Sequence, residues 1–226
     1  MSIELVRVAA AEQFQLAPGN HATREEGLCA MEAVAWLAGL PHSDKPACTS
    51  EILAGYVRHL NDHMPEEERH RLVAFLPDLI GTADRELDHV LNAYLAWQAL
   101  HLFAPAALRA QDYEDEAELL EKQRRDYDAE DVVDSILKSW YRPDELPPLH
   151  WALIRAHKAS RLAGWFYSQR NEWSRGVWGD TSYDSCATAA AGAAYQAYRT
   201  GCPHAWDLAL FVLDEALTIV KARQLE

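Results

Sequence analysis

Apolar residues recur every three or four positions along most of this chain, which is the period of an amphipathic α-helix. Glycine and proline residues divide the pattern into segments, and no segment shows the alternation typical of a half-buried strand. Alanine is abundant and β-branched residues are few, a balance that also favours helix. Two clear stripes consist of Leu53, Tyr56, Val57 and Leu60 and of Leu208, Phe211, Val212 and Ala216. The pattern predicts an all-α fold, a compact multi-helix domain of about eight or nine helices.

Residues 21–50 carry the clearest signal for the start of a helix. Thr23 is followed three residues later by Glu26, a capping-box pattern, and Gly39 is a natural residue to end the helix. Within such a helix, side chains spaced i, i+4 and i+7 lie on one face. The residues with this spacing are Glu25, Cys29 and Glu32.

The same stretch concentrates side chains that bind metals or attack substrates. The predicted helix contains Cys29, and the proline-rich loop after it contains His42, Asp44 and Cys48. Thiolate, imidazole and carboxylate groups bind zinc or iron, and the same set could place a nucleophilic cysteine beside a histidine base. No pair has the close spacing of a zinc finger, and a cysteine is commonly a small buried residue. A transition-metal site such as zinc, a thiol-dependent enzyme and a purely structural cluster all remain open, and no cofactor is assigned.

The charge of the chain limits its partners. There are 35 acidic and 21 basic residues, and the net charge is −14, which argues against nucleic-acid binding by counterion release. No apolar run is long enough for a transmembrane helix, and the first residues do not resemble a signal peptide. Four cysteines in 226 residues are too few for a disulfide scaffold. We therefore expect a cytoplasmic protein with no membrane or nucleic-acid partner.

Residues 112–134 hold a large share of this charge. The segment has eleven acidic and three basic residues, a net charge of −8. One interpretation is a solvated helix or pair of helices, and the other is an acidic surface that docks a partner or mimics a nucleic acid.

A second candidate surface lies in the tryptophan-rich stretch that follows Pro147. Helical spacing there brings basic and aromatic side chains together, a combination that stacks planar or sugar-like ligands or anchors a protein. These residues are Trp151, His157, Arg161 and Trp165. Ordinary core packing is the alternative interpretation.

Pro147 also marks the predicted boundary between two halves, residues 1–146 and 147–226. The N-terminal half contains the acidic segment, and the C-terminal half is rich in tryptophan and alanine. An alanine-rich helix ending near Arg199 should be thin enough to lie centrally. Its cysteine start and Gly201-Cys202-Pro203-His204 end partly repeat the segment from Cys29 to His42, so the two halves could be pseudo-repeats within one compact unit.

Three segments carry a resemblance to a known group of proteins. Arg24–Ala35, Pro41–Cys48 and Leu79–Thr82 resemble segments of small helical proteins from actinobacteria and their phages. The resemblance covers residues 20–110 and implies a shared helical core and a bacterial or phage setting. No activity is assigned to that group, so the resemblance transfers no catalytic residue.

Two functions follow from these observations. The first is a non-enzymatic binding or regulatory protein that holds a protein partner on an acidic or aromatic helical surface. The second is a small metal- or thiol-dependent enzyme centred on Cys29, His42, Asp44 and Cys48. A homo-oligomer is compatible with either function.

Overall fold

The computed structural model describes residues 14–123, 126–139, 148–168 and 186–225, and side chains are undescribed at 126–130, 138–139 and 161–168. These residues form helices and connecting turns and contain no strand, which confirms the all-α prediction. The α-helices are α2 (Ala30–Leu37), α3 (Glu51–His63), α4 (Glu66–Arg69), α5 (Asp88–Gln98), α6 (Ala104–Arg109), α7 (Glu114–Glu121), α8 (Asp126–Ser139), α9 (Pro148–Ser168), α10 (Cys186–Arg199) and α11 (Ala205–Gln224). Shorter helical turns are η1 (His70–Phe75), η2 (Pro77–Leu79) and the π-helical η3 (Ala99–Phe103).

The chain forms two compact units. The first contains residues 1–88 and 213–226, and the second contains residues 89–212. The predicted boundary at Pro147 lies in residues 140–147, outside the described part of the chain. In the second unit α9 packs against α10, α6 and η3, so helices from both sides of residue 147 share one core.

The first unit is built around α2. Seven of its eight residues are buried, so α2 is a core helix rather than a surface helix with one apolar face. It packs against α3, whose predicted stripe is confirmed because Leu53, Tyr56, Val57 and Leu60 are fully buried. Removing side chains of this size from water stabilises a fold by about 1.5–3 kcal/mol each.

The start of α2 corrects the predicted capping box. The helix begins at Ala30 with Cys29 as its N-cap, whereas Thr23 and Glu26 lie in a separate turn before it. Glu26 does accept a backbone N–H, from Ala22 at 3.1 Å, but it closes the turn rather than opening a helix. Glu25 therefore does not share a helical face with Cys29 and Glu32, and the prediction of that face was wrong.

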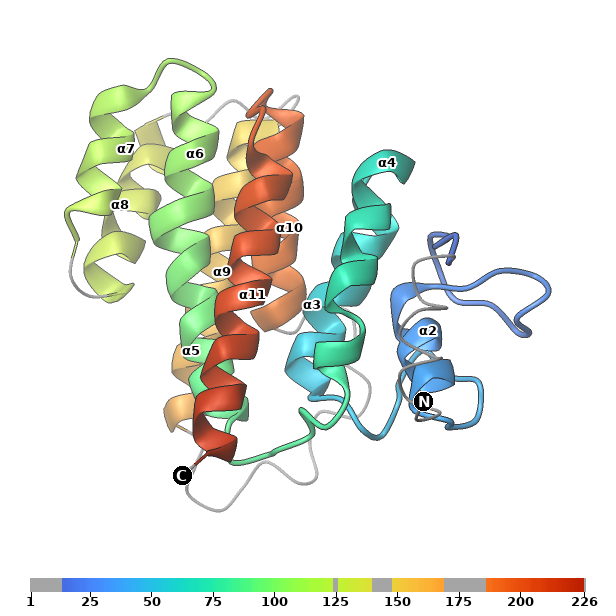
Figure 1. The fold of residues 1–226 in the computed structure, drawn as a ribbon. Coiled ribbons are helices and arrows are strands. Elements are labelled where there is room, and N and C mark those ends of the chain that lie inside the picture. Colours follow the sequence, from blue (N-terminus) through green and yellow to red (C-terminus); the bar gives the residue numbers. More distant parts are fainter. Residues whose placement is uncertain (1–13, 124–125, 140–147, 169–185, 226) are drawn as a thin grey trace. The chain divides into compact units, whose positions relative to one another are not determined.

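The second unit contains a continuous rod formed by α5, η3 and α6 (Figure 1). The π-helical turn precedes Pro105, which lacks a backbone N–H and cannot continue the normal α-helical hydrogen bonding. The alanine-rich α10 packs closely on α9, and most of its alanines are fully buried. This burial confirms the prediction that α10 is central, because methyl side chains let neighbouring helices approach closely.

Candidate functional site

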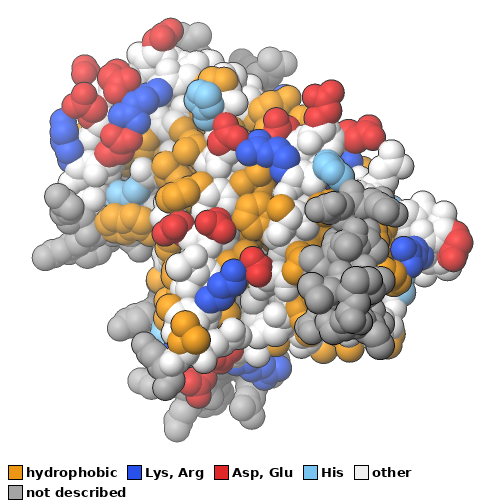
Figure 2. Space-filling view, viewed as in Figure 1, with side chains coloured by type: hydrophobic (Ala, Val, Ile, Leu, Met, Phe, Trp, Pro, Cys, Tyr) orange, Lys and Arg blue, Asp and Glu red, His pale blue; other side chains and the backbone are white. Residues whose placement is uncertain are grey.

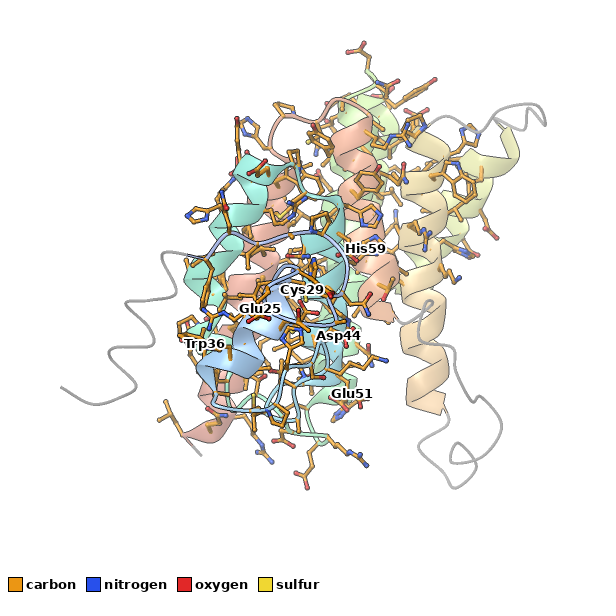
Figure 3. All side chains as sticks on the ribbon, turned by 90° about the vertical axis from the view of Figure 1, so that its right-hand side faces the viewer. Glu25, Cys29, Trp36, Asp44, Glu51 and His59 are labelled. Atoms are coloured by element: carbon orange, nitrogen blue, oxygen red, sulfur yellow. The ribbon has the colours of Figure 1, made fainter. Side chains whose placement is uncertain are left out.

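The N-terminus of α2 is held by a reciprocal capping box. The Sγ atom of Cys29 accepts the backbone N–H of Glu32 at 3.4 Å, and the Glu32 carboxylate accepts the backbone N–H of Cys29 at 2.7 Å. A cysteine here takes the place usually filled by serine or threonine. Figure 3 shows Cys29 at the beginning of α2 and Glu25 in the turn before it.

The Glu32 carboxylate also binds the turn that precedes the helix. It accepts the backbone N–H of His21 at 2.6 Å and the Nδ1–H of the same residue at 2.9 Å. Because an ionised carboxylate only accepts hydrogen bonds, the His21 ring must donate from Nδ1. The Glu32 side chain is only 1% exposed, so these contacts replace its entire hydration.

A second histidine joins this group from the loop after α2. The Nε2 atom of His42 donates to the main-chain oxygen of His21 at 3.0 Å and lies 3.6 Å from Oε1 of Glu32. Glu32, His21 and His42 thus tie both flanking segments to the helix. We call these three residues the Glu32 cluster.

The hydrogen bonds in the Glu32 cluster keep its carboxylate ionised. Burial alone would raise the pKa of Glu32, but donors from the Cys29 backbone, the His21 backbone and the His21 ring outweigh it and lower the pKa. The cluster therefore contains a buried negative charge at neutral pH. This buried carboxylate can hold and orient imidazole rings.

Gly27 permits the close packing of the His21 ring. A Cβ atom placed on Gly27 would overlap with Cδ2 and Nε2 of that ring. The ring cannot move aside without losing its hydrogen bond to Glu32. A glycine is therefore required at this position by the close approach of an imidazole to the backbone.

The predicted metal ligands have separate contacts in the structure. Cys29 caps α2, and His42 donates to the His21 carbonyl. The main-chain carbonyl of Asp44 accepts a hydrogen bond from Nη1 of Arg58 at 2.9 Å. The Sγ atom of Cys48 lies 3.8 Å from Oγ1 of Thr49. Within the described ranges, no group of three or more histidine, cysteine or acidic side chains is arranged to hold a metal ion. The structure therefore gives the predicted metal site no support.

The thiol-dependent alternative gains no support either. Burial is the main reason that the pKa of the Cys29 thiol rises to about 12, so this thiol is protonated at neutral pH. A protonated, 2% exposed thiol is a poor nucleophile. Cys186 is also fully buried, and its Sγ donates to the Asn92 carbonyl at 3.3 Å.

These environments predict which thiol reacts in the native protein. Cys48 is half-buried, whereas Cys29, Cys186 and Cys202 are buried. Titration with Ellman's reagent should show rapid reaction of Cys48 alone, with the other three thiols released only on unfolding. Cys48→Ser should abolish the rapid phase and Cys29→Ser should leave it unchanged. If the Cys48→Ser protein still reacts rapidly, and the rapid phase disappears when Cys29 is replaced as well, Cys29 is a reactive thiol.

A pocket of about 300 Å³ lies beside the turn that precedes α2. Its lining includes Thr23, Arg24, Glu25, Trp36, Leu40 and His42. The Arg24 guanidinium lies 4.4 Å from the centroid of the Trp36 ring, and Phe14 meets the same ring edge-on at 5.3 Å. The sequence did not indicate this pocket, because the turn and the end of α2 meet only when the chain is folded.

The predicted acidic surface lies partly on α7, where Figure 2 shows acidic and basic side chains gathered together. Arg109 binds Glu114 at 2.9 Å and Glu121 at 2.8 Å, and Lys122 binds Glu118 at 2.7 Å. Mutual hydrogen bonding accordingly raises the pKa of Arg109 and lowers that of Glu121. Much of the negative charge on this helix is therefore already paired.

Two acids of α7 form no direct ion pair in the described structure, although the charge of Asp115 acts on Lys122. Asp115 and Glu116 make no ion pair with any described residue, and Leu119 one turn later is 47% exposed. Ala117 and Leu120 of the same helix are fully buried, and Glu116, one turn before Leu120, is half-buried at the edge of this buried face. We call Asp115, Glu116 and Leu119 the α7 surface.

The predicted aromatic surface is only partly described. Trp151 is 42% exposed, which fits a surface position better than the alternative of core packing. His157 lies 3.5 Å from Asp134 of α8, so it contacts a neighbouring helix rather than a free ligand face. Arg161 and Trp165 lie in α9, but their side chains are outside the described part of the structure.

Comparisons with known proteins add no homologue. No family model, no curated protein and no solved structure matches this chain. The resemblance to actinobacterial and phage proteins, with the setting it implies, stays a prediction.

Among the described helices, none combines the length and apolarity needed to cross a membrane.

Proposed function

We propose that this chain is a non-enzymatic binding protein that holds a basic segment of a protein partner on the α7 surface. The observation that carries the proposal is the exposure of Leu119 directly beside Asp115 and Glu116, two acids that make no ion pair with any described residue. A partner with one apolar side chain flanked by lysine or arginine would complement both features. Apolar contact would supply affinity, and the acids would supply specificity and rapid association.

The fold supports a rigid docking surface. Ala117 and Leu120 anchor α7 to the core of the second unit, and α7 packs against α6. The bridge from Arg109 to Glu114 and Glu121 ties both ends of α7 to α6. A partner would therefore lose little affinity to ordering this helix.

A binding experiment tests the proposal. A fluorescent amphipathic peptide of lysine and leucine should bind the protein, with fluorescence anisotropy as the readout. Asp115→Asn with Glu116→Gln should weaken binding at least about tenfold, as expected for losing two charge contacts. Leu119→Ser should also weaken binding, and its effect should persist in high salt because it removes apolar contact.

A matched control distinguishes docking from general attraction to an acidic protein. Glu66 and Glu67 are exposed acids of α4, and Glu66→Gln with Glu67→Gln changes the net charge by the same amount. This control should weaken binding less than about twofold at physiological salt. Equal losses in the two double variants, or an unchanged affinity after Leu119→Ser, would contradict the α7 surface as the docking site.

A further inference from the structure

The pocket beside α2 is lined by a cation that lies against two aromatic rings. Two aromatic rings lie against the guanidinium of Arg24, with centroids at 4.4 Å for Trp36 and 5.9 Å for Phe14. Stacking of this kind fixes the plane of a guanidinium while leaving its N–H groups able to donate. Among the carboxylates in the part of the chain that the structure describes, none forms an ion pair with Arg24. A positioned cation without a carboxylate partner is suited to an anion from outside the protein.

The wall around this cation is mainly apolar. Trp36 and Leu40 are the large apolar residues that line the pocket, and Leu40 is 37% exposed. The volume of about 300 Å³ falls at the lower end of the range for small-molecule sites. The space and its lining therefore favour a small molecule with an apolar body.

The part of the lining formed by His42 is held in place by the Glu32 cluster. His42 lines the pocket, its Nε2–H donates to the His21 carbonyl, and His21 is in turn bound by the buried Glu32. Each link is a hydrogen bond of 3.0 Å or less, so the histidine wall has a set orientation before any ligand arrives. A preorganised wall lowers the entropic cost of binding.

The charge around the pocket favours a ligand with a single negative charge over one with two. Glu25 also lines the pocket, and the chain as a whole has a net charge of −14. Both would repel a phosphate or a dicarboxylate more strongly than a monocarboxylate. We propose that the pocket formed by Arg24, Trp36, Leu40 and His42 binds a small monocarboxylate with an apolar body, its carboxylate on Arg24 and its body against Trp36. This site is independent of the α7 surface.

Two indole probes of similar size and opposite charge test the proposal. Indole-3-acetate should bind the intact protein in isothermal titration calorimetry, whereas tryptamine should not. Arg24→Gln should weaken indole-3-acetate binding at least about tenfold, the size expected for losing a charge-assisted pair. Inorganic phosphate should not compete with indole-3-acetate.

Arg71→Gln is the matched control. Arg71 lies in the same unit, is exposed and pairs with Glu68 outside the pocket, so its replacement changes the net charge equally. The affinity of the Arg71→Gln protein for indole-3-acetate should stay within about twofold of the affinity of the unmodified protein. Absence of binding, equal binding of tryptamine, or an equal loss in both variants would overturn the proposal. Circular dichroism spectra of the variants establish that each is folded.

Discussion

Glu32→Gln is expected to lower the free energy of unfolding by about 2–4 kcal/mol, although the two side chains have nearly the same volume. The carboxylate of Glu32 faces two backbone N–H groups, of His21 and Cys29, and the donating Nδ1 of His21. A glutamine has one accepting oxygen, so its NH₂ group would face at least one of these donors inside the protein. Urea unfolding at neutral pH, followed by circular dichroism, measures the difference.

Glu25→Gln is the control for that measurement. Glu25 is exposed in the turn before α2, so its replacement should change the free energy of unfolding by less than about 0.5 kcal/mol. If Glu32→Gln has an effect this small, Glu32 does not hold the N-terminus of α2 as described.

The pH dependence of the stability difference between Glu32→Gln and the unmodified protein shows whether the charge or the shape of Glu32 is responsible. The pKa of Glu32 is lowered in the folded protein, so its stabilising contribution is complete above the ordinary glutamate pKa of about 4.3. The contribution is lost as the pH falls through the lower, folded-state value, because protonation then makes Glu32 resemble glutamine. The stability difference between Glu32→Gln and the unmodified protein should therefore shrink as the pH falls below that range. A difference that persists at low pH would show that shape, not charge, is responsible.

Gly27→Ala is expected to destabilise the fold by about 2–3 kcal/mol, a cost typical of overpacking an occupied site. The added methyl group would overlap with the His21 ring, and the ring is fixed by its hydrogen bond to Glu32. If the His21 ring moved to relieve the overlap, it would lose that hydrogen bond. Thermal and urea unfolding measure the loss.

Two further variants identify the cause of this loss. Gly81 has a φ of +83° and open space around it, so Gly81→Ala should cost about 1 kcal/mol, from backbone strain alone. In a His21→Ala background, Gly27→Ala should cost much less than in the unmodified protein, because the colliding ring is absent. If the two substitutions instead lower the free energy of unfolding additively, the alanine methyl group does not contact the ring.

Local rules predicted the helices more accurately than their ends. The stripe of α3 and the central position of α10 follow from apolar periodicity and from alanine content, both of which act within one helix. The start of α2 was misplaced because two capping-box patterns lie only two residues apart in sequence, one from Thr23 to Glu26 and one from Cys29 to Glu32. The second box prevails because Glu32 also collects donors from His21.

By itself, the sequence determined that this protein is helical, that it is strongly acidic and that residues 21–50 are a well-specified structural unit. Hydrophobic periodicity and net charge depend on the order and identity of residues, so neither requires knowledge of the fold. The tertiary structure alone decided which side chains of that unit meet. Glu32 binds His21, eleven residues away, and Arg24 stacks on Trp36 across a turn, since folding brings side chains within the few ångströms over which hydrogen bonds and ring contacts act.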